Sequence, residues 1–318
     1  MASSSPLSVL VLAGGISHER EISLRSGRIV ADALRARDVR VSVADPDARL
    51  LTVIEESAPD VIWPVLHGAS GEDGALRSLL ELMGVAFVGA DSAATRLAWD
   101  KPAAKTLVER SGLHTPESLT LSRDAFRELG AESVMNSIAQ HLSFPLIVKP
   151  TRGGSAQGVS WVANGDDLRK ALVHAFTYGD VALIERHIHG TEVAVTVIDT
   201  GDGPRALPPV EIAPVSGRYT FEARYNAGET DFYCPPRKIT AVLDRVTQDA
   251  LQIHTTLGLR DLSRIDLIVD DHGIPWFLEA SVMPGLTETS AFGVAVDQAG
   301  FDAGGIFLAL AESVSRRH

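Results

Sequence analysis

Two acidic residues face each other in a predicted β-hairpin near the C-terminus. Alternating apolar and polar residues indicate strands at 264–270 and 275–281, joined by a polar turn of four residues. A turn of that length places Asp266 opposite Glu279, on the same face of the hairpin. Neighbouring carboxylates repel each other, so a bound cation is the expected reason for their pairing. Carboxylate oxygens fit Mg²⁺, which keeps water and substrate phosphate in its remaining positions.

The hairpin should have one polar and one apolar face. Arg264 and Ser281 join the two acids on the polar face, where Ser281 could serve as a third metal ligand. The apolar face should consist of Ile265, Leu267, Val269, Trp276, Leu278 and Ala280. A simpler interpretation stays open, in which Arg264 neutralises both acids on an exposed surface of the hairpin.

Other charged residues lie at the ends of predicted apolar strands. Lys149 follows such a strand, where an unpaired ammonium is costly and a phosphate partner would explain it. The Gly-rich segment 151–158 comes next and can offer backbone N–H groups to the same anion. Lys101 is a second candidate for a phosphate. Glu185 ends another strand, where it could bind an adenine amino group or a ribose hydroxyl, and Glu192 begins the following strand. Taken singly, each of these residues is as readily structural as functional.

Composition and missing motifs exclude several classes of protein. With 318 residues, the chain is long enough for two or three lobes, and 45% hydrophobic with 6% aromatic content is typical of a globular enzyme. No apolar run approaches the ~20 residues of a membrane span, and no signal-peptide core is recognisable. The net charge of −12 argues against a nucleic-acid surface, and the single cysteine excludes an internal disulfide. No P-loop or serine-hydrolase motif occurs. We therefore expect a cytoplasmic protein that binds neither nucleic acid nor membrane.

The first 90 residues alternate strand and helix patterns. Strands are predicted at 7–12, 39–44, 61–66 and 86–88, and helices at 22–37 and 71–83. This βαβ series predicts a parallel sheet with helices on its faces. Ligands bind at the carboxyl ends of such strands, where the Gly-rich loops 14–21 and 67–74 lie.

The remaining chain predicts two mixed lobes. Residues 91–184 hold helical patterns at 92–100, 102–111 and 166–178 and strands at 145–148, 159–162 and 181–185. Residues 185–318 hold a strand at 192–199, a helix near 239–257, the hairpin and a terminal helix. Segment 201–206 matches a loose dinucleotide fingerprint, but prolines follow it and predict a hairpin turn instead. Segment 214–236 has little periodicity yet many aromatic residues, so we expect a loop that covers a site.

Six segments, taken in order, resemble the D-alanine–D-alanine ligases of the ATP-grasp superfamily. They are residues 11–27, 66–74, 147–159, 183–192, 221–235 and 264–290. The resemblance covers essentially the whole chain and implies an α/β protein of three-lobed ATP-grasp architecture. Its parts would be an N-terminal parallel βαβ domain (1–90), a central α+β lobe (91–184) and a C-terminal α+β lobe (185–318), with ATP clamped between the last two.

The resemblance also implies an activity. Such an enzyme is an ATP-dependent carboxylate–amine ligase that joins two D-alanines for peptidoglycan precursor synthesis. ATP phosphorylates the carboxylate of the first amino acid, and the amine of the second attacks the acyl phosphate, which releases ADP and phosphate. Arg264 and the backbone N–H of Gly285 would stabilise the oxyanion. A homodimer is the family expectation.

The resemblance assigns further residues to ATP, the metal and the amino acids. Lys101 and Lys149 would contact the phosphates of ATP, and Glu185 and Glu192 would hold its adenine and ribose end. The residues of the metal site would be Asp266, Glu279 and Ser281, around two Mg²⁺ ions for which Mn²⁺ could substitute. The residues of the amino-acid sites would be Glu19 for the first ammonium, His67 beside it, and Ser290 for the second carboxylate. Ser155 and Tyr225 would link Glu19 to the lid in one network that excludes water.

Three departures from the family pattern leave alternatives open. The usual E-G-S-S loop is replaced by 153–156, Ser281 stands in place of an Asn ligand, and residues 291–293 replace the usual sequence after Ser290. The first two changes could loosen ATP or metal binding, and the third could alter the acceptor. The chain could therefore be a D-Ala–D-Ala ligase, a related ligase of specialised metabolism with another acceptor, or a non-catalytic paralogue that binds nucleotide or amino acid.

Overall fold

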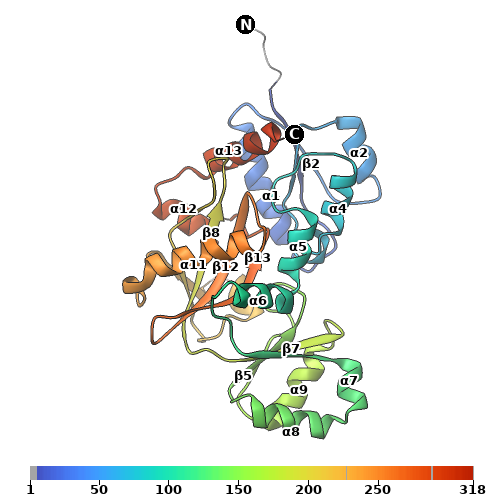
Figure 1. Ribbon diagram of the computed structural model, residues 1–318. Helices are drawn as coiled ribbons and strands as arrows, with labels where there is room; N and C mark the ends of the chain where they lie inside the picture. Colours follow the sequence, from blue (N-terminus) through green and yellow to red (C-terminus); the bar gives the residue numbers. More distant parts are fainter. Residues whose placement is uncertain (1–5, 227, 288, 318) are drawn as a thin grey trace.

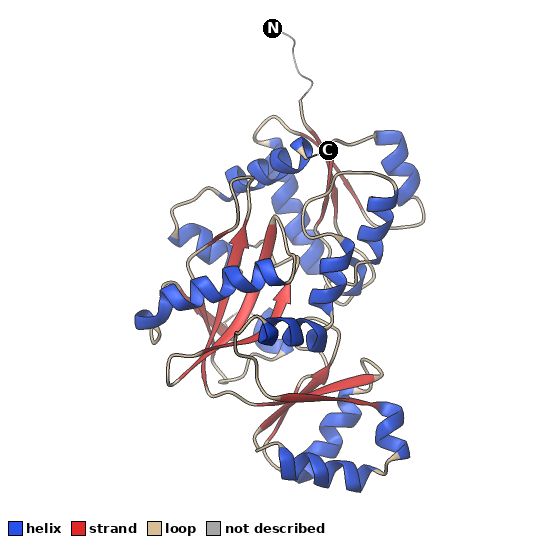
Figure 2. Ribbon diagram, in the orientation of Figure 1, coloured by secondary structure: helices blue, strands red, loops and turns tan. Residues whose placement is uncertain are grey.

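Three separate β-sheets organise the protein (Figures 1 and 2). The computed structural model describes residues 6–226, 228–287 and 289–317. The sheet built from the start of the chain and the largest sheet lie together in the upper part of the molecule, and the middle sheet forms a separate lower lobe (Figure 1). The predicted mixed α/β architecture is confirmed, while the lobe boundaries at 90 and 184 stay predictions.

The first sheet is parallel, as the βαβ pattern predicts. Its strand order is β2-β1-β3, from β1 (Ser8–Leu12), β2 (Arg40–Ala44) and β3 (Val61–Pro64). Its helices are α1 (Arg20–Arg35), α2 (Leu50–Ser57), α3 (Ala69–Glu72) and α4 (Ala75–Leu82). Helix α1 lies so close to this sheet that a Cβ at Gly27 would collide with Ala13. The expected fourth strand at 86–88 is only an isolated bridge between Ile62 and Phe87, so that prediction was wrong.

The middle sheet is antiparallel and carries its helices on one side (Figure 2). Its order is β4-β7-β5-β6, from β4 (Ser118–Ser122), β5 (Leu146–Pro150), β6 (Ser160–Val162) and β7 (Val181–Arg186). Its helices are α7 (Arg123–Glu128), α8 (Ala131–His141) and α9 (Gly165–Ala175). Strands β5, β6 and β7 follow the sequence predictions, whereas β4, α7 and α8 were missed.

The largest sheet carries the predicted hairpin at its edge. Its order is β11-β10-β8-β12-β13, with β9 paired to β8. The strands are β8 (Gly190–Ile198), β9 (Arg205–Ala206), β10 (Val210–Pro214), β11 (Thr230–Tyr233), β12 (Leu262–Asp270) and β13 (Pro275–Ser281). Around it lie α5 (Ser92–Trp99), α6 (Lys101–Arg110), α10 (Phe221–Tyr225), a 3₁₀ turn (Thr240–Val242), α11 (Leu243–Thr256), α12 (Ala291–Gln298) and α13 (Ala303–Arg316). The turn predicted at 201–206 is confirmed by the antiparallel pairing of β8 with β9.

Segment 214–236 is more regular than the sequence predicts. Strands β10 and β11 pair antiparallel at its two ends, with Pro214 opposite Thr230. Helix α10 lies between them and is capped by the Thr220 side chain, which accepts a hydrogen bond from the Ala223 N–H. The excursion is therefore a strand pair with a helical tip, because short strands of mixed polarity leave little periodic signal.

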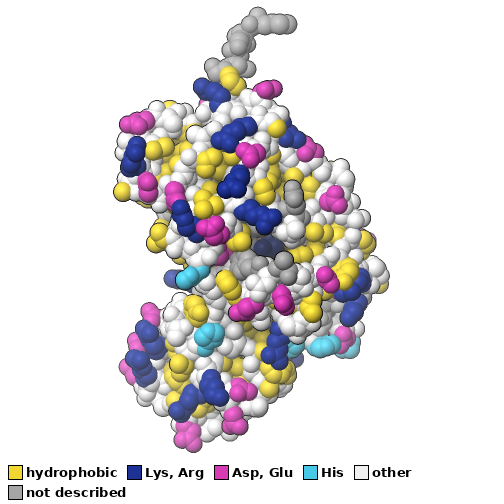
Figure 3. Space-filling view, turned by 180° about the vertical axis from the view of Figure 1, so that it is seen from behind, with side chains coloured by type: hydrophobic (Ala, Val, Ile, Leu, Met, Phe, Trp, Pro, Cys, Tyr) yellow, Lys and Arg dark blue, Asp and Glu magenta, His cyan; other side chains and the backbone are white. Residues whose placement is uncertain are grey.

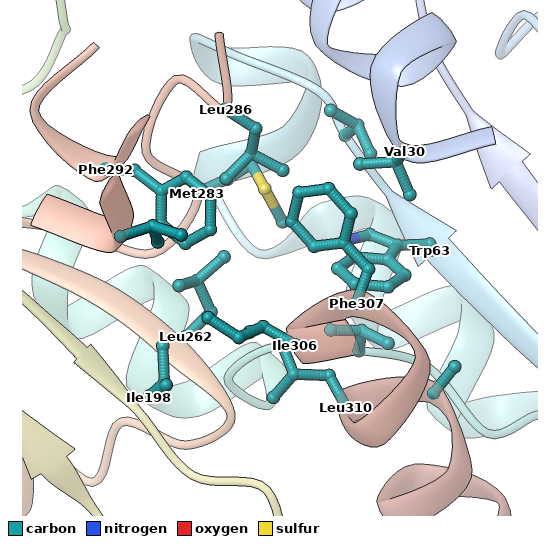
Figure 4. Packing of buried hydrophobic residues seen from close by; sticks show 14 of the residues in the cluster. Val30, Trp63, Ile198, Leu262, Met283, Leu286, Phe292, Ile306, Phe307 and Leu310 are labelled. Carbon is teal, nitrogen blue, oxygen red and sulfur yellow. The ribbon is translucent and has the colours of Figure 1, made fainter. Parts of the chain in front are cut away.

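One apolar core joins the first sheet to the C-terminal helices (Figure 4). The Trp63 ring of β3 meets the Phe307 ring of α13 edge-on, with ring centroids 5.5 Å apart. The Phe292 ring of α12 stacks on Phe307 at 5.7 Å. Met283 and Leu286, which follow β13, belong to the same cluster. The segment after the hairpin is thereby anchored to the first sheet.

The hairpin has the predicted register at its polar end and a bulge beyond it. Asp266 pairs with Glu279 and Arg264 with Ser281, as expected. The register then shifts, and Leu267 pairs with Phe277. Phe277 is therefore buried in the core, while Leu278 and Trp276 are only partly buried. The expectation that Leu278 and Trp276 share the apolar face was wrong, because one extra residue in β13 reverses the alternation.

Within the described residues, no single helix is long and apolar enough to cross a membrane. Helices α12 and α13 reach the required length only together, and they bend by 104° at the break between them.

The bulge predicts unequal effects of two neighbouring substitutions. Phe277→Ala removes a fully buried ring and should lower the free energy of unfolding by about 3–5 kcal/mol. Leu278→Ala lies on the partly exposed side of the bulge and should cost less than half as much. Chemical denaturation followed by circular dichroism measures both values. Equal losses would contradict the bulge.

Candidate active site

Two adjoining cavities lie between the middle sheet and the rest of the molecule. Figure 3 shows the surface indented above the lower lobe. The larger cavity, of about 700 Å³, runs along the middle sheet and is lined by Lys149, Glu185 and Glu192 among others. The smaller one, of about 230 Å³, lies toward the first sheet and is lined by Glu19 and His67 among others. Lys101, Gly153, Gly154, Tyr219, Arg224 and Glu279 line both cavities.

A buried glutamate between two lysines forms the floor of the larger cavity. The Glu185 carboxylate at the end of β7 binds the Lys149 ammonium at 2.5 Å and the Lys105 ammonium at 2.8 Å. Burial alone would raise the pKa of Glu185, but Lys149 and then Lys105 outweigh it and lower this pKa to about 2. Burial lowers the pKa of Lys105, whereas Glu185 and Glu279 overcome the effect of burial at Lys149 and raise its pKa. Glu185 and Lys149 therefore stay charged at neutral pH.

The opposed acids of the hairpin are each held by cations. Asp266 accepts two hydrogen bonds from the Arg264 guanidinium, both of 2.7 Å. Glu279 lies 3.3 Å from the Lys101 ammonium, which also donates to the Gly153 carbonyl at 2.6 Å. Burial would raise the pKa of Glu279, yet Lys101 and the other nearby cations lower it to about 2. Arg264 therefore binds Asp266 and not both acids, and the acids face a cleft and not an exposed surface.

Glu192 sits beside these acids without a comparable cation. Burial, and then repulsion by Asp266 and Glu279, raise its pKa to about 7 although Arg224 opposes them. A carboxyl that is half protonated near neutral pH can either donate a hydrogen bond or accept one. Such a group suits contact with a neutral hydroxyl.

The donor chemistry of the hairpin fits a magnesium ion. Asp266 and Glu279 present carboxylate oxygens on directly opposed residues, and cationic side chains already occupy part of that space. Within the described residues there is no cluster of three or more His, Cys, Asp or Glu side chains that could hold a metal alone. Two protein carboxylates with open positions match an ion that completes its shell with water and phosphate.

The smaller cavity brings together residues from the first sheet and the middle sheet. The Ser155 hydroxyl donates a hydrogen bond to the Glu19 carboxylate. Ser17 fixes the neighbouring loop, because its hydroxyl donates to the His67 carbonyl at 2.9 Å. His67 is buried, and burial, with Arg264 adding to it, lowers the pKa of its imidazole. The imidazole is therefore neutral, and its Nε2 has no hydrogen-bond partner among the described residues.

The segment after the hairpin closes the smaller cavity. Gly285 and Ser290 both line it. Ser290 caps α12: its hydroxyl donates to the Thr287 carbonyl at 2.5 Å and accepts from the Gly293 N–H at 3.2 Å. Ala291, at the start of α12, lines the cavity beside it. The expected place of the second amino acid is thus at a helix N-terminus with a small side chain next to it.

The structure gathers the sequence-predicted residues in one cleft, with one exception. The side chain of Tyr225 lies outside the part of the chain that the structure describes, although its backbone ends α10. The roles assigned to the individual residues stay predictions.

Several charged residues in and around the cleft were missed from the sequence, and three of them contact other members of the site. Lys105 lies one helical turn after Lys101, a spacing that could have identified it. Glu72 and Arg224 are the other two, and both line the smaller cavity. Arg224 stacks over the Tyr219 ring at 4.1 Å and lies in the middle of segment 214–236, where no pattern marks it.

Comparisons with known proteins identify relatives along more than nine tenths of the chain. The family model described as D-ala D-ala ligase C-terminus matches residues 107–310, and the one described as D-ala D-ala ligase N-terminus matches residues 45–90. A D-alanine–D-alanine ligase of Pelotomaculum thermopropionicum is 36% identical over 93% of both chains. One of Nitrosomonas europaea is 37% identical over 92% of both chains.

Solved structures agree with these relatives. The VanG D-Ala:D-Ser ligase of Enterococcus faecalis is 26% identical, with a TM-score of 0.84 over 98% of this chain and 100% of that one. A D-alanine–D-alanine ligase of Bacillus anthracis in complex with ATP is 25% identical, with a TM-score of 0.81 over 98% of both chains. Its bound ATP belongs to that protein.

The buried lysine–glutamate cluster predicts a pH-dependent stability difference. Glu185→Gln leaves two buried ammonium groups without their counter-ion and should lower the free energy of unfolding by about 3 kcal/mol. Because the pKa of Glu185 is lowered on folding from the usual 4.5 to about 2, its contribution is complete above about pH 5 and fades as the pH falls toward 2.

Urea denaturation of both proteins at pH 7 and at about pH 3.5 measures this difference. The gap between wild type and Glu185→Gln should be narrower at the lower pH. Glu55 is an exposed glutamate of α2, and Glu55→Gln is the matched control. This variant should leave the free energy of unfolding unchanged at both pH values. A gap that widens in acid would contradict the assigned charges.

Proposed function

We propose that this chain, which belongs to the D-alanine–D-alanine ligase family, joins two D-alanines at the expense of ATP for peptidoglycan precursor synthesis. One observation carries the proposal: the large cavity with its lysines opens beside the opposed acids into a small cavity that holds Glu19 and Ser290. A nucleotide and two amino acids can thereby meet at one point. Matches to named ligases along more than nine tenths of the chain support the same reaction.

ATP would occupy the large cavity. Lys101 and Lys149 would contact its phosphates, because both residues line this cavity and a lysine ammonium attracts phosphate. Glu185 and Glu192 would hold the adenine and ribose end. Glu192 is suited to a ribose hydroxyl, since its pKa of about 7 allows it to donate or to accept. Lys105 would keep Glu185 ionised while Lys149 turns to phosphate.

The first D-alanine would lie in the small cavity. The Glu19 carboxylate would accept its ammonium, and the neutral His67 would lie beside it. One carboxylate oxygen of this D-alanine then attacks the γ-phosphorus of ATP, the bond to ADP breaks, and an acyl phosphate forms. The second amine attacks the acyl carbon and loses a proton, and phosphate leaves with the oxygen it received from the carboxylate.

Arg264 and the Gly285 N–H would stabilise negative charge on the reacting carbonyl oxygen. Both line the small cavity, and Arg264 keeps its charge because Asp266 more than offsets the effect of burial and raises the pKa of the guanidinium. A preorganised cation at such a point stabilises the transition state more than the ground state. Asp266 would thus orient the Arg264 guanidinium and would also lie beside the ATP phosphates.

Asp266 and Glu279 would hold Mg²⁺, and Ser281 stands at the third position that the family fills with Asn. When bound, the metal neutralises phosphate charge during transfer. The two carboxylates must be ionised for this role, and the low pKa of Glu279 meets that condition.

The second D-alanine would place its carboxylate at Ser290 and the first turn of α12. Ala291 leaves room beside Ser290. A substrate screen measures which side-chain sizes this site accepts. Family resemblance also supports a homodimer that works in the cytoplasm.

A substrate screen tests the proposed reaction. Purified protein with ATP and Mg²⁺ should release phosphate with D-alanine alone and produce the D-Ala–D-Ala mass in equal amount. Phosphate release only with a second, different amino acid or amine would favour a ligase with another acceptor. ATP binding by calorimetry without turnover for any pair would instead identify a non-catalytic paralogue.

The lid network gives a second prediction. Ser155 already contacts Glu19, and Tyr225 would complete the set that keeps water from the acyl phosphate. Tyr225→Phe should slow dipeptide formation and raise the share of phosphate released without dipeptide. Phe221→Leu, four residues earlier in α10, is the control for packing. Equal turnover of Tyr225→Phe and wild type with unchanged KM would contradict the lid assignment.

A further inference from the structure

Ser281, the last residue of the hairpin, contacts Glu72 in helix α3, which follows the first sheet's loop at His67 and Gly68. The Ser281 hydroxyl at the end of β13 donates a hydrogen bond of 3.2 Å to Oε1 of Glu72 in α3. Both side chains line the smaller cavity, and Glu72 is only 8% exposed. The family pattern has Asn at position 281, so this contact comes from a residue in which the chain departs from its relatives.

Glu72 uses its other oxygen to hold the loop that faces the first amino acid. Its Oε2 accepts a hydrogen bond of 2.8 Å from the Gly68 N–H, the residue after His67. The loop is also fixed from its other side, because a Cβ at Gly68 would come within 3.1 Å of the Glu19 carboxylate and 3.0 Å of Ser17. A small shift of Glu72 would therefore move His67 relative to Glu19.

The carboxyl of Glu72 depends on these two donors. A buried carboxyl needs hydrogen-bond partners, and removal of one leaves part of its cost of burial uncompensated. Within the described residues, the hydrogen bonds to the Glu72 carboxyl come from Gly68 and Ser281. Ser281 is also joined through β13 to Glu279, two residues earlier in the strand. The contact thus links the loop of the first amino acid to the strand of the metal-binding acids.

We propose that Ser281 and Glu72 are positioning residues that hold the His67–Gly68 loop in register with the catalytic hairpin. This inference rests on the proposed ligase reaction. The Ser281 hydroxyl donates its hydrogen bond to Glu72, so the main effect of Ser281 is on the site of the first amino acid. The metal is held by Asp266 and Glu279, and loss of the Ser281 hydroxyl leaves the affinity for metal nucleotide nearly unchanged.

A double-mutant cycle tests the contact. Ser281→Ala should raise the KM of the first D-alanine by about 5- to 30-fold, which corresponds to about 1–2 kcal/mol. Its affinity for Mn²⁺–ADP, measured by calorimetry without turnover, should stay within about twofold of wild type. Glu72→Ala should produce the same pattern, and the double variant should be no worse than Glu72→Ala alone, because Glu72→Ala has already removed the contact with Ser281.

Glu72→Gln is the conservative variant. A glutamine can still accept from the Gly68 N–H and contact the Ser281 hydroxyl, so it should retain a KM within about threefold of wild type. It also keeps the proposal testable if Glu72→Ala fails to fold.

A second glutamate–serine pair, Glu81 and Ser92, is the matched control. Glu81 accepts hydrogen bonds from the Ser92 hydroxyl at 2.6 Å and from the Ser92 N–H at 2.7 Å, and neither residue lines a cavity described above. Ser92→Ala should lower the melting temperature and leave the KM of the first D-alanine unchanged. A purely structural role for Ser281 would give that same result.

Two results would overturn the proposal. One is a tenfold or larger loss of Mn²⁺–ADP affinity in Ser281→Ala with an unchanged amino-acid KM, which would make Ser281 a metal ligand. The other is a double variant in which the KM increases of the two single variants multiply, which would make the two residues independent.

Ser281→Asn should keep or raise metal affinity. Failure of the proposed function is distinct, since wild type itself would then release no phosphate with D-alanine.

Discussion

Two carboxylates that repel each other, Asp266 and Glu279, are held side by side in a cleft, where Asp266 is buried and Glu279 is partly exposed. Their register follows from the hairpin, and the cations around Glu279 lower the pKa of its carboxyl. Arg264 comes from the same strand, Lys101 from the start of α6 and Lys149 from the middle sheet. Burial opposes the charges of Glu279, Arg264 and Lys149, which therefore stabilise one another as a balanced set. The rest of the fold supplies and positions its members.

The balance of charge explains why the cleft lies where separate sheets meet. In the proposed reaction, Lys149 turns from Glu185 to the phosphates when a nucleotide enters, while Lys105 stays with Glu185. On the other side, Glu19 contacts Ser155 of the Gly-rich loop, which connects the first sheet to the middle one. The apolar core around Phe307 keeps the segment after the hairpin in place. A shift of any of these parts would separate charges that depend on one another.

Local pattern in the sequence predicted the parts of the site that lie within one element. The opposition of the two acids follows from turn length, and the parallel first sheet follows from the βαβ series. Strict alternation missed the bulge at Leu278, because the extra residue carries no marker of its own. Lys105 and Glu72 were missed because their partners lie 80 and 209 positions away in the chain. Segment 214–236 carries little periodic signal because its regular elements, α10 and β11, are short.

The central claim is that this cleft activates a carboxylate by transferring phosphate to it. D-Alanine labelled with ¹⁸O in its carboxylate tests that claim directly when the released phosphate is analysed by mass spectrometry. Phosphate should carry one labelled oxygen for each dipeptide formed, because the oxygen that attacks ATP leaves with the phosphate. Dipeptide formation with unlabelled phosphate would contradict the claim.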